Sequence, residues 1–163
     1  MFVACATSSA SAQAVQGNPQ AGAGKVAMCI GCHGIAGYQA SFPEVHKVPK
    51  ISGQSAAYIA SALEAYRKGD RSHPSMRAVA QSLSDQDIAD VAAYYQAHTT
   101  PSASPAQPHD PPAQVAALIE KGACFSCHGQ GFAKPIDPSY PKVAGQHPDR
   151  KSTRLNSSHS DRS

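Results

Sequence analysis

The sequence contains one five-residue pattern twice: Cys29-Ile30-Gly31-Cys32-His33, and then Cys124-Phe125-Ser126-Cys127-His128. In both copies two thiols lie three positions apart, at the end of an expected helical turn, and a histidine follows at once. Thiols at this spacing can each add to one vinyl group of the same porphyrin, while the adjacent imidazole reaches the iron. Cys-x-x-Cys-His is the attachment signature of c-type haem. The sequence therefore predicts two covalently attached haems, with attachment through Cys29, Cys32, Cys124 and Cys127 and iron ligation by His33 and His128.

Three other interpretations of paired cysteines fit the sequence less well. A zinc ribbon needs its two Cys-x-x-Cys pairs about 15–20 residues apart, whereas Cys32 and Cys124 are 92 positions apart. A thioredoxin-like pair is expected in a βαβ context, and no alternating strand pattern occurs near either motif. Simple disulfides would not need a histidine after both pairs. Haem attachment is the interpretation that accounts for all six residues.

Helices are predicted around both motifs. Asn18 and Pro19 favour a helix start, and that helix is expected to run into the first motif; Asp110 and the prolines after it repeat this signal before the second. A further helix covers about 54–68, and another begins at Ser84, close to a capping box. No convincing strand is found, so the predicted fold class is all-α. The apolar stripes of the two later helices are Tyr58, Ile59, Ala62, Leu63 and Tyr66, and Ile88, Val91, Ala92 and Tyr95.

The second half of the chain repeats the first. Val48-Pro49-Lys50-Ile51-Ser52-Gly53-Gln54 matches Tyr140-Pro141-Lys142-Val143-Ala144-Gly145-Gln146. Internal duplication of a small haem domain is the simplest explanation. We expect a first domain at 15–99, a Pro-rich and semi-rigid linker at 100–112, and a partial second domain at 113–148.

The two ends are interpreted separately. Residues 1–14 end in Ala12-Gln13-Ala14, which is typical of a signal-peptidase site, so this stretch is expected to be the remnant of a secretory signal. Cys5 only weakly resembles a lipoprotein attachment site. Residues 149–163 begin with a run that resembles the in-frame translation of a common sequencing-library adapter, and they are expected to be non-native. This tail holds four of the 14 Lys and Arg and two of the 11 Asp and Glu, so without it the net charge falls from +3 to +1.

Composition excludes several classes of protein. The chain has 163 residues, of which 41% are hydrophobic and only 6% aromatic, with no tryptophan. A core this poor in large side chains would be marginal for two small domains unless a cofactor contributed to packing. No window approaches the ~18 consecutive apolar residues of a transmembrane helix. The small net charge does not suggest nucleic acid as a partner.

The first haem needs either an open iron site or a second axial ligand. Met76, in an expected loop at 73–76, is the candidate, because Met28 is adjacent to a thioether cysteine and cannot reach the opposite face of the ring. His46, His73 and His98 compete for the role. A thioether paired with an imidazole favours reduced iron and suits an electron carrier. The spacing from Pro49 to Met76 is 27 positions, and the same spacing from Pro141 lies beyond the last residue, so the second haem is expected to be incompletely ligated here.

These residues together resemble the di-haem class I cytochromes c, specifically the cytochrome c4 family. The resemblance covers residues 18–148 and is carried by both haem motifs, by Pro49-Lys50-Ile51-Ser52-Gly53-Gln54, by Met76 and by the stretch from Leu83 to Tyr95. It implies two tandem all-α cytochrome c domains, the second incomplete, in the bacterial periplasm. By similarity, Pro49 and Pro141 would offer carbonyl oxygens to the second ring nitrogens of His33 and His128, and so set ring orientation and basicity.

The resemblance also implies a function. It suggests electron transfer from a quinol-oxidising complex toward a terminal oxidase, by a carrier that is not an enzyme. The alternative is a haem subunit of a dehydrogenase or a di-haem peroxidase, with a haem-based gas sensor as a weaker third. A peroxidase needs an open iron and nearby acid–base groups, and ligation by Met76 would argue against an open site in the first domain.

Overall fold

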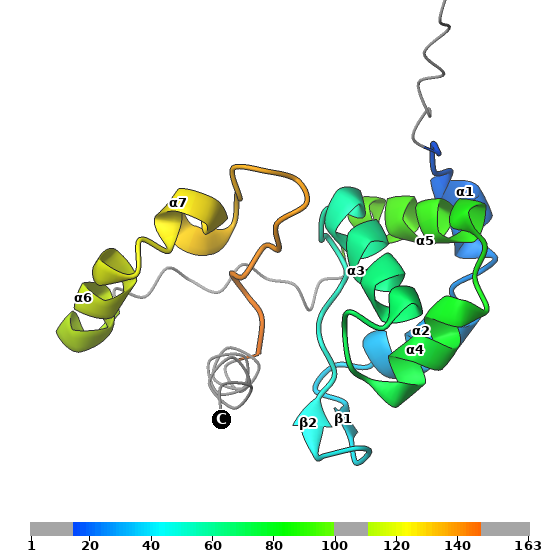
Figure 1. Cartoon of the computed structure of the whole chain (residues 1–163), viewed down its shortest axis with the longest axis horizontal. Coiled ribbons are helices and arrows are strands. Elements are labelled where there is room, and N and C mark those ends of the chain that lie inside the picture. The colour runs from blue at the N-terminus through cyan, green and yellow to red at the C-terminus, as the bar shows by residue number, and fades with distance from the viewer. Residues whose placement is uncertain (1–14, 100–110, 148–163) are drawn as a thin grey trace, which may run out of the picture.

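A computed structural model of the chain describes residues 15–99 and 111–147 (Figure 1). The predictions for residues 1–14, for 100–110 and for the tail at 149–163 lie outside these ranges. The helix before the second motif begins at Ala113 with Pro112 as its N-cap, so the expected start at Asp110 is wrong. The described parts are mostly helical, which confirms the all-α fold class. The first part holds α1 (Pro19–Ala23), α2 (Ala27–His33), β1 (Gln39–Ala40), β2 (His46–Lys47), α3 (Ala56–Lys68), α4 (Pro74–Gln81) and α5 (Asp85–Ala97).

The expected N-terminal helix is two helices. Asn18 caps α1 as predicted, because its side chain accepts hydrogen bonds from the backbone N–H groups of Gln20 and Ala21. The helix ends at Ala23, and α2 starts again at Ala27. The contact between α1 and α5 requires glycine at position 22, because a Cβ there would be 2.2 Å from the carbonyl oxygen of Asp90. The glycine therefore permits α1 to pack closely on α5, and α2 follows after a turn at 24–26.

Two further sequence expectations were wrong. Met76 does not lie in a loop: it lies in the first turn of α4, which begins with Pro74 and is capped by the ring of His73. A short antiparallel hairpin also exists, in which Gln39 pairs with Lys47 and Ala40 with His46. The two-residue strands are too short to show a periodicity, whereas α4 is short but amphipathic and starts at a proline that was interpreted as part of a loop.

The helices at 56–68 and 85–97 follow their predicted patterns. Gly69 ends α3 in the left-handed conformation, with φ of 92°, and Ser84 and Asp87 form a complete capping box at the start of α5. The buried faces of these helices meet in one core with neighbouring elements. Its buried members are Val26, Ile59, Leu63, Ala80, Ile88, Val91, Ala92 and Tyr95.

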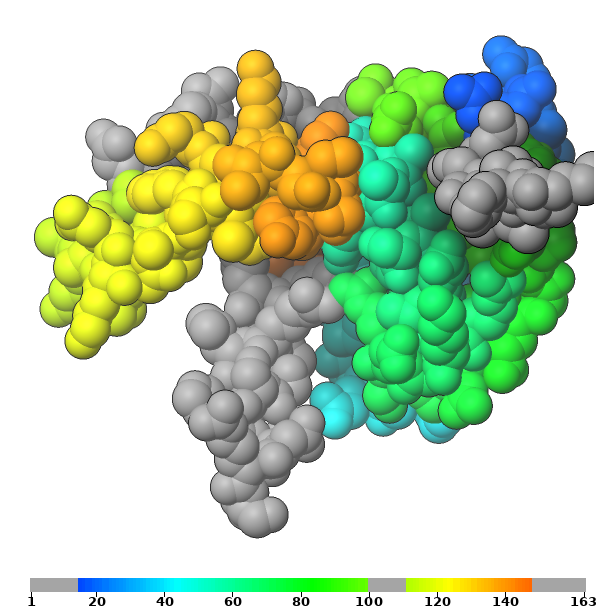
Figure 2. All heavy atoms as spheres, turned by 45° about the horizontal axis from the view of Figure 1, so that its top comes forward, coloured from blue at the N-terminus to red at the C-terminus, as the bar shows by residue number. Residues whose placement is uncertain are grey.

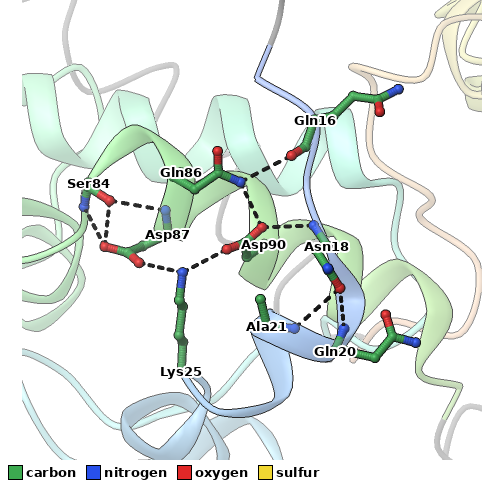
Figure 3. Close-up of polar contacts among 9 residues, drawn as sticks. All are labelled: Gln16, Asn18, Gln20, Ala21, Lys25, Ser84, Gln86, Asp87 and Asp90. Carbon is green, nitrogen blue, oxygen red and sulfur yellow. Dashed lines mark hydrogen bonds and ion pairs between the residues drawn. The ribbon is translucent and has the colours of Figure 1, made fainter.

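A polar network ties the N-terminal segment to α5 (Figure 3). The buried carboxylate of Asp90 accepts hydrogen bonds from the backbone N–H of Asn18 (2.7 Å) and from the side chain of Gln86 (2.8 Å). Lys25 bridges Asp87 and Asp90 at 2.7 and 2.6 Å. Lys25 holds the pKa of both carboxyl groups below their ordinary value, and they raise the pKa of Lys25. The network therefore anchors the segment that leads into the first Cys-x-x-Cys-His motif.

The second part holds α6 (Ala113–Lys121), α7 (Phe125–His128) and the 3₁₀ turn η2 (Gln130–Phe132). Figure 1 shows α6 and α7 lying away from the helical body, with the segment after η2 running back toward it. Leu118 and Ile136 are exposed. Within the described residues, this part contributes no member to the buried core.

Replacing Lys25 by Met should make stability depend differently on pH. The stability from the lowered carboxyl pKa values is present above pH 3.8 and is lost as pH falls through the folded-state values. The stability from the raised Lys25 pKa is present below pH 10.5 and is lost above it. We expect Lys25→Met to be less stable than the parent between these limits, with a difference that shrinks outside them. Urea unfolding of the haem-loaded chain, from below pH 3.8 to above pH 10.5, measures the effect.

The matched control is Lys68→Met, which removes an exposed i,i+4 pair with Glu64 at 3.7 Å. Such pairs contribute little, so this variant should follow the parent at every pH. A pH-independent loss of stability in Lys25→Met would contradict the assignment of the effect to the ion pairs.

Candidate haem site

A cavity of about 330 Å³ lies among the helices of the first part, and His128 and part of the segment 141–146 from the second part contribute to its lining. Its walls are mainly apolar and are formed by the inner faces of α3, α4 and α5 together with the segment that precedes α3. An apolar cavity with a few polar groups is the usual form of a cofactor site. The apolar residues that line it include Ile51, Ile59, Leu63, Val79, Leu83 and Val91.

The first motif lines this cavity from α2. Cys29 is half-buried, Cys32 is exposed, and both are free thiols. Burial raises the pKa of the Cys29 thiol. Nδ1 of His33 donates a hydrogen bond to the carbonyl oxygen of Pro49 at 2.8 Å. The backbone carbonyl thus fixes the ring orientation and the tautomer of His33, as is common for metal-binding histidines.

Met76 also lines the cavity, from α4. Two of its sequence competitors, His46 and His73, lie there too, with their rings edge to face at 5.5 Å. Nδ1 of His73 accepts a hydrogen bond from the backbone N–H of Met76 at 3.3 Å, so this ring caps α4. His98 stacks on Tyr94 at 4.8 Å and is not part of the lining.

The second motif repeats the histidine geometry. Nδ1 of His128 donates to the carbonyl oxygen of Pro141 at 3.2 Å. His128 and Pro141 reach the edge of the same cavity, whereas Cys124 and Cys127 do not line it. Both cysteines are free thiols, Cys124 half-buried and Cys127 exposed. The structure therefore brings the first motif and Met76 around one cavity, and the second histidine also lines that cavity.

Several lining residues had not been singled out as site residues from the sequence. Arg71 stacks over the rings of Tyr58 and Tyr66, with its guanidinium carbon 5.7 and 5.4 Å from their centroids. Its Nη2 also donates to the hydroxyl of Tyr58 at 3.2 Å. Lys50 and Gln54 lie at the border with the second half. Only the repeated Pro-Lys-x-x-Gly-Gln segment gave a sequence signal for the last two. It was interpreted as a sign of duplication and of family resemblance, with a site role expected only for its proline.

The residues present fit a covalently attached haem. Two thiols and an imidazole project from one short helix, the imidazole is oriented by a backbone carbonyl, and a thioether lines the same apolar cavity. Within residues 15–99 and 111–147, no group of three or more His, Cys, Asp or Glu side chains could hold a bare metal ion. Among the helices of those two ranges, none has the length and apolar character needed to cross a bilayer.

Comparison with known proteins gives the same class. The cytochrome c family model matches residues 20–99. Cytochrome c-554(548) of Halomonas halodenitrificans is 45% identical over 82 residues, covering 48% of this chain and 94% of the relative. Cytochrome c4 of Thiocapsa roseopersicina is 32% identical over 149 residues, covering 82% of this chain and 70% of the relative. The chain spans 66–70% of the length of the cytochromes c4 that it matches.

Two further matches cover most of the chain. The thiosulfate dehydrogenase electron acceptor of Stutzerimonas stutzeri is 32% identical over 166 residues, covering 94% of this chain and 75% of the relative. The crystal structure of reduced recombinant cytochrome c4 from Pseudomonas stutzeri superposes with a TM-score of 0.60 and 27% identity, covering 86% of this chain and 79% of that one.

The fold and the site are those of a class I cytochrome c. Within that class, the chain belongs to the cytochrome c4 family. It is therefore a haem-containing electron-transfer protein and not an enzyme, and its cofactor is covalently bound c-type haem, with two haems in keeping with the di-haem family.

Proposed function

We propose that the first haem is attached through Cys29 and Cys32 and that His33 and Met76 are its two axial ligands. The support is the shared cavity that all four residues line, together with the hydrogen bond from His33 to Pro49. That bond engages Nδ1, which assigns iron binding to Nε2. The second haem would be attached through Cys124 and Cys127, with His128 as ligand in the same setting.

The bound haem supplies a reversible one-electron couple at its iron. The residues around it would tune this couple rather than carry out bond chemistry. The carbonyl of Pro49 makes the His33 imidazole a stronger donor, and the Met76 thioether favours the reduced iron. The apolar walls keep water from the ring, which lowers the local dielectric and also influences the potential. Two-sided ligation would leave no open position for a substrate at the first haem.

From this site we infer a periplasmic electron carrier that works between a quinol-oxidising complex and a terminal oxidase. The carrying observation is that the His33 imidazole, oriented by Pro49, and the Met76 thioether line the same mainly apolar cavity as Cys29 and Cys32. The chain would then contain two cytochrome c domains, at 15–99 and 113–148, joined by a linker at 100–112. Residues 1–14 would be the remnant of the export signal. Covalent attachment suits a compartment outside the cytoplasm, where a loosely held cofactor would be lost.

Mutation of one cysteine pair tests the attachment sites. We expect the parent chain, matured in a host that attaches c-type haem, to carry two haems by intact-mass measurement under denaturing conditions. The variant with Cys29→Ala and Cys32→Ala should carry only one, because each pair serves its own porphyrin. Cys5→Ala is the matched control and should retain both. Two haems on the double variant would rule out these attachment sites.

Replacement of the thioether tests the second ligand of the first haem. We expect Met76→Ala to lower the midpoint potential of that haem and to open its iron to carbon monoxide and peroxide, because the soft ligand is gone. Met28→Ala removes a methionine that lines the same cavity beside Cys29 but cannot reach the opposite face of the ring, so its iron should stay closed to carbon monoxide and peroxide. Redox titration and ligand-binding difference spectra make the measurement. Binding of carbon monoxide to the first haem with Met76 intact would instead support a sensor or peroxidase.

A second function has a specific observation in its favour. The chain is 32% identical, over 94% of its length, to a protein named as a thiosulfate dehydrogenase electron acceptor. A solved structure named as the thiosulfate dehydrogenase TsdBA of Marichromatium purpuratum is similar at 34% identity, with a TM-score of 0.59, over 78% of this chain and 28% of that one. A dehydrogenase rather than a quinol-oxidising complex could thus be the electron donor.

Rates of reduction distinguish the two donors. If the first proposal is correct, a quinol-oxidising complex with its quinol should reduce the ferric chain in a saturable reaction at least tenfold faster than a thiosulfate dehydrogenase with thiosulfate. Stopped-flow absorbance of the haem bands follows both reactions, and a reaction without donor protein is the blank. The reverse order of rates would replace the first proposal with the second.

A further inference from the structure

The repeated segments 49–54 and 141–146 bind each other reciprocally. The backbone N–H of Lys50 donates to Oε1 of Gln146, and Nε2 of Gln146 donates back to the Lys50 carbonyl, both at 3.0 Å. In the opposite direction, the backbone N–H of Lys142 donates to Oε1 of Gln54 at 2.9 Å, and Nε2 of Gln54 donates to the Lys142 carbonyl at 3.1 Å. Each glutamine therefore pairs with both main-chain groups of one residue in the other half.

The two lysine side chains complete the arrangement. Nζ of Lys50 donates to the carbonyl oxygen of Gly145 at 3.1 Å, and Nζ of Lys142 donates to that of Gly53 at 2.7 Å. Both glycines adopt the left-handed backbone, with φ of 75°. We call these two segments, with their six mutual hydrogen bonds, the latch. In Figure 2 the orange segment, which ends just before residue 148, lies against the turquoise part of the first half.

The latch has the self-complementary character of a two-fold interface, because equivalent residues make equivalent bonds in the two directions. Gln54 is 6% exposed, so its amide has little access to water. A buried polar group that loses its partner costs more than the bond contributes when made. These six bonds therefore hold the two segments in one defined register.

The latch lies next to the histidines of both motifs. The carbonyl that accepts from His33 belongs to Pro49, and the next residue is the one whose two main-chain groups are held by Gln146. In the same way, the carbonyl that accepts from His128 belongs to Pro141, and the residue after it is held by Gln54. Each histidine-orienting carbonyl is thus positioned from the opposite half of the chain.

We propose that Gln146 is a positioning residue for the first haem and Gln54 for the second, each acting across the latch through the proline carbonyl of the other half. This inference rests on the proposed ligation by His33 and His128. The hydrogen bond from the imidazole to the carbonyl raises the donor strength of the ligand. Loosening the carbonyl weakens that bond, and a weaker imidazole donor favours reduced iron. A substitution in one half should therefore change the potential of the haem in the other half.

Gln146→Met tests this in the haem-loaded chain, because it keeps the volume of the side chain and removes both hydrogen bonds to Lys50. We expect the midpoint potential of the first haem, identified by its Met76 ligation, to rise, and the paramagnetically shifted NMR signals of the His33 ring to move. The matched control is Gln114→Met, the same substitution at an exposed glutamine of α6 that does not line the cavity. It should leave both readouts unchanged. Gln146 also lines the cavity. Gln146→Asn keeps an amide there but is one methylene too short to hold Lys50, so it should shift both readouts in the same direction; a shift in Gln146→Met alone would overturn the crossed role.

Intact mass of the same samples distinguishes failure of the proposed haem sites from failure of the proposed role of Gln146. Loss of either haem, or absence of His33 signals from the parent chain, would count against the proposed ligation. If both haems are attached and the first-haem potential and His33 signals of Gln146→Met match those of the parent, the crossed role is overturned. A larger hydrodynamic size with unchanged potential also overturns it, because the latch would then only hold the halves together.

Discussion

The cavity at the centre of the first part is the constraint on which the other features depend. The helices α3, α4 and α5 pack around it, so much of their apolar surface faces the cavity. Across the described residues, eight hydrophobic side chains are buried, and no large side chain falls below 2% exposure. Domains of this size are marginal without an added source of burial. Covalently bound haem supplies that burial, which makes the cofactor part of the fold.

The position of the first motif depends on contacts far from it in sequence. The network of Lys25, Asp87 and Asp90 holds α1 on α5, and the absence of a side chain at Gly22 lets the two helices approach closely. With α1 fixed, the short α2 carries its thiols and imidazole to the cavity. The Pro49 carbonyl then sets the His33 ring from the opposite side. The segment 49–54, which provides this carbonyl, also contacts the second half. The orientation of the His33 ring and the arrangement of the two halves therefore depend on the same segment.

The sequence predicted elements where a strong local pattern coincided with long-range packing. The capping box at Ser84, the stop at Gly69 and the apolar stripe of α5 are of this kind. The break between α1 and α2 was not predicted. Gly22 and Gly24 lower helix propensity only modestly, and it is the packing of α1 on α5 that ends the helix there. Helix α4 was missed because its eight residues have few large apolar side chains, although His73 before Pro74 was a readable start signal. The hairpin strands have two residues each, which is too short for any periodicity to show.

The sequence by itself determined the cofactor, the number of attachment motifs and the class of fold. Thioether attachment and the adjacent imidazole need only residues that are neighbours along the chain, so their spacing is sufficient evidence. Only the tertiary structure decided which residues surround the first haem site and what orients its histidine. Met76 is 43 positions after His33, and Gln146 is 96 positions after Lys50. No local pattern can indicate such pairings, because they arise when separate segments are brought together by the burial of apolar surface and the pairing of buried backbone groups.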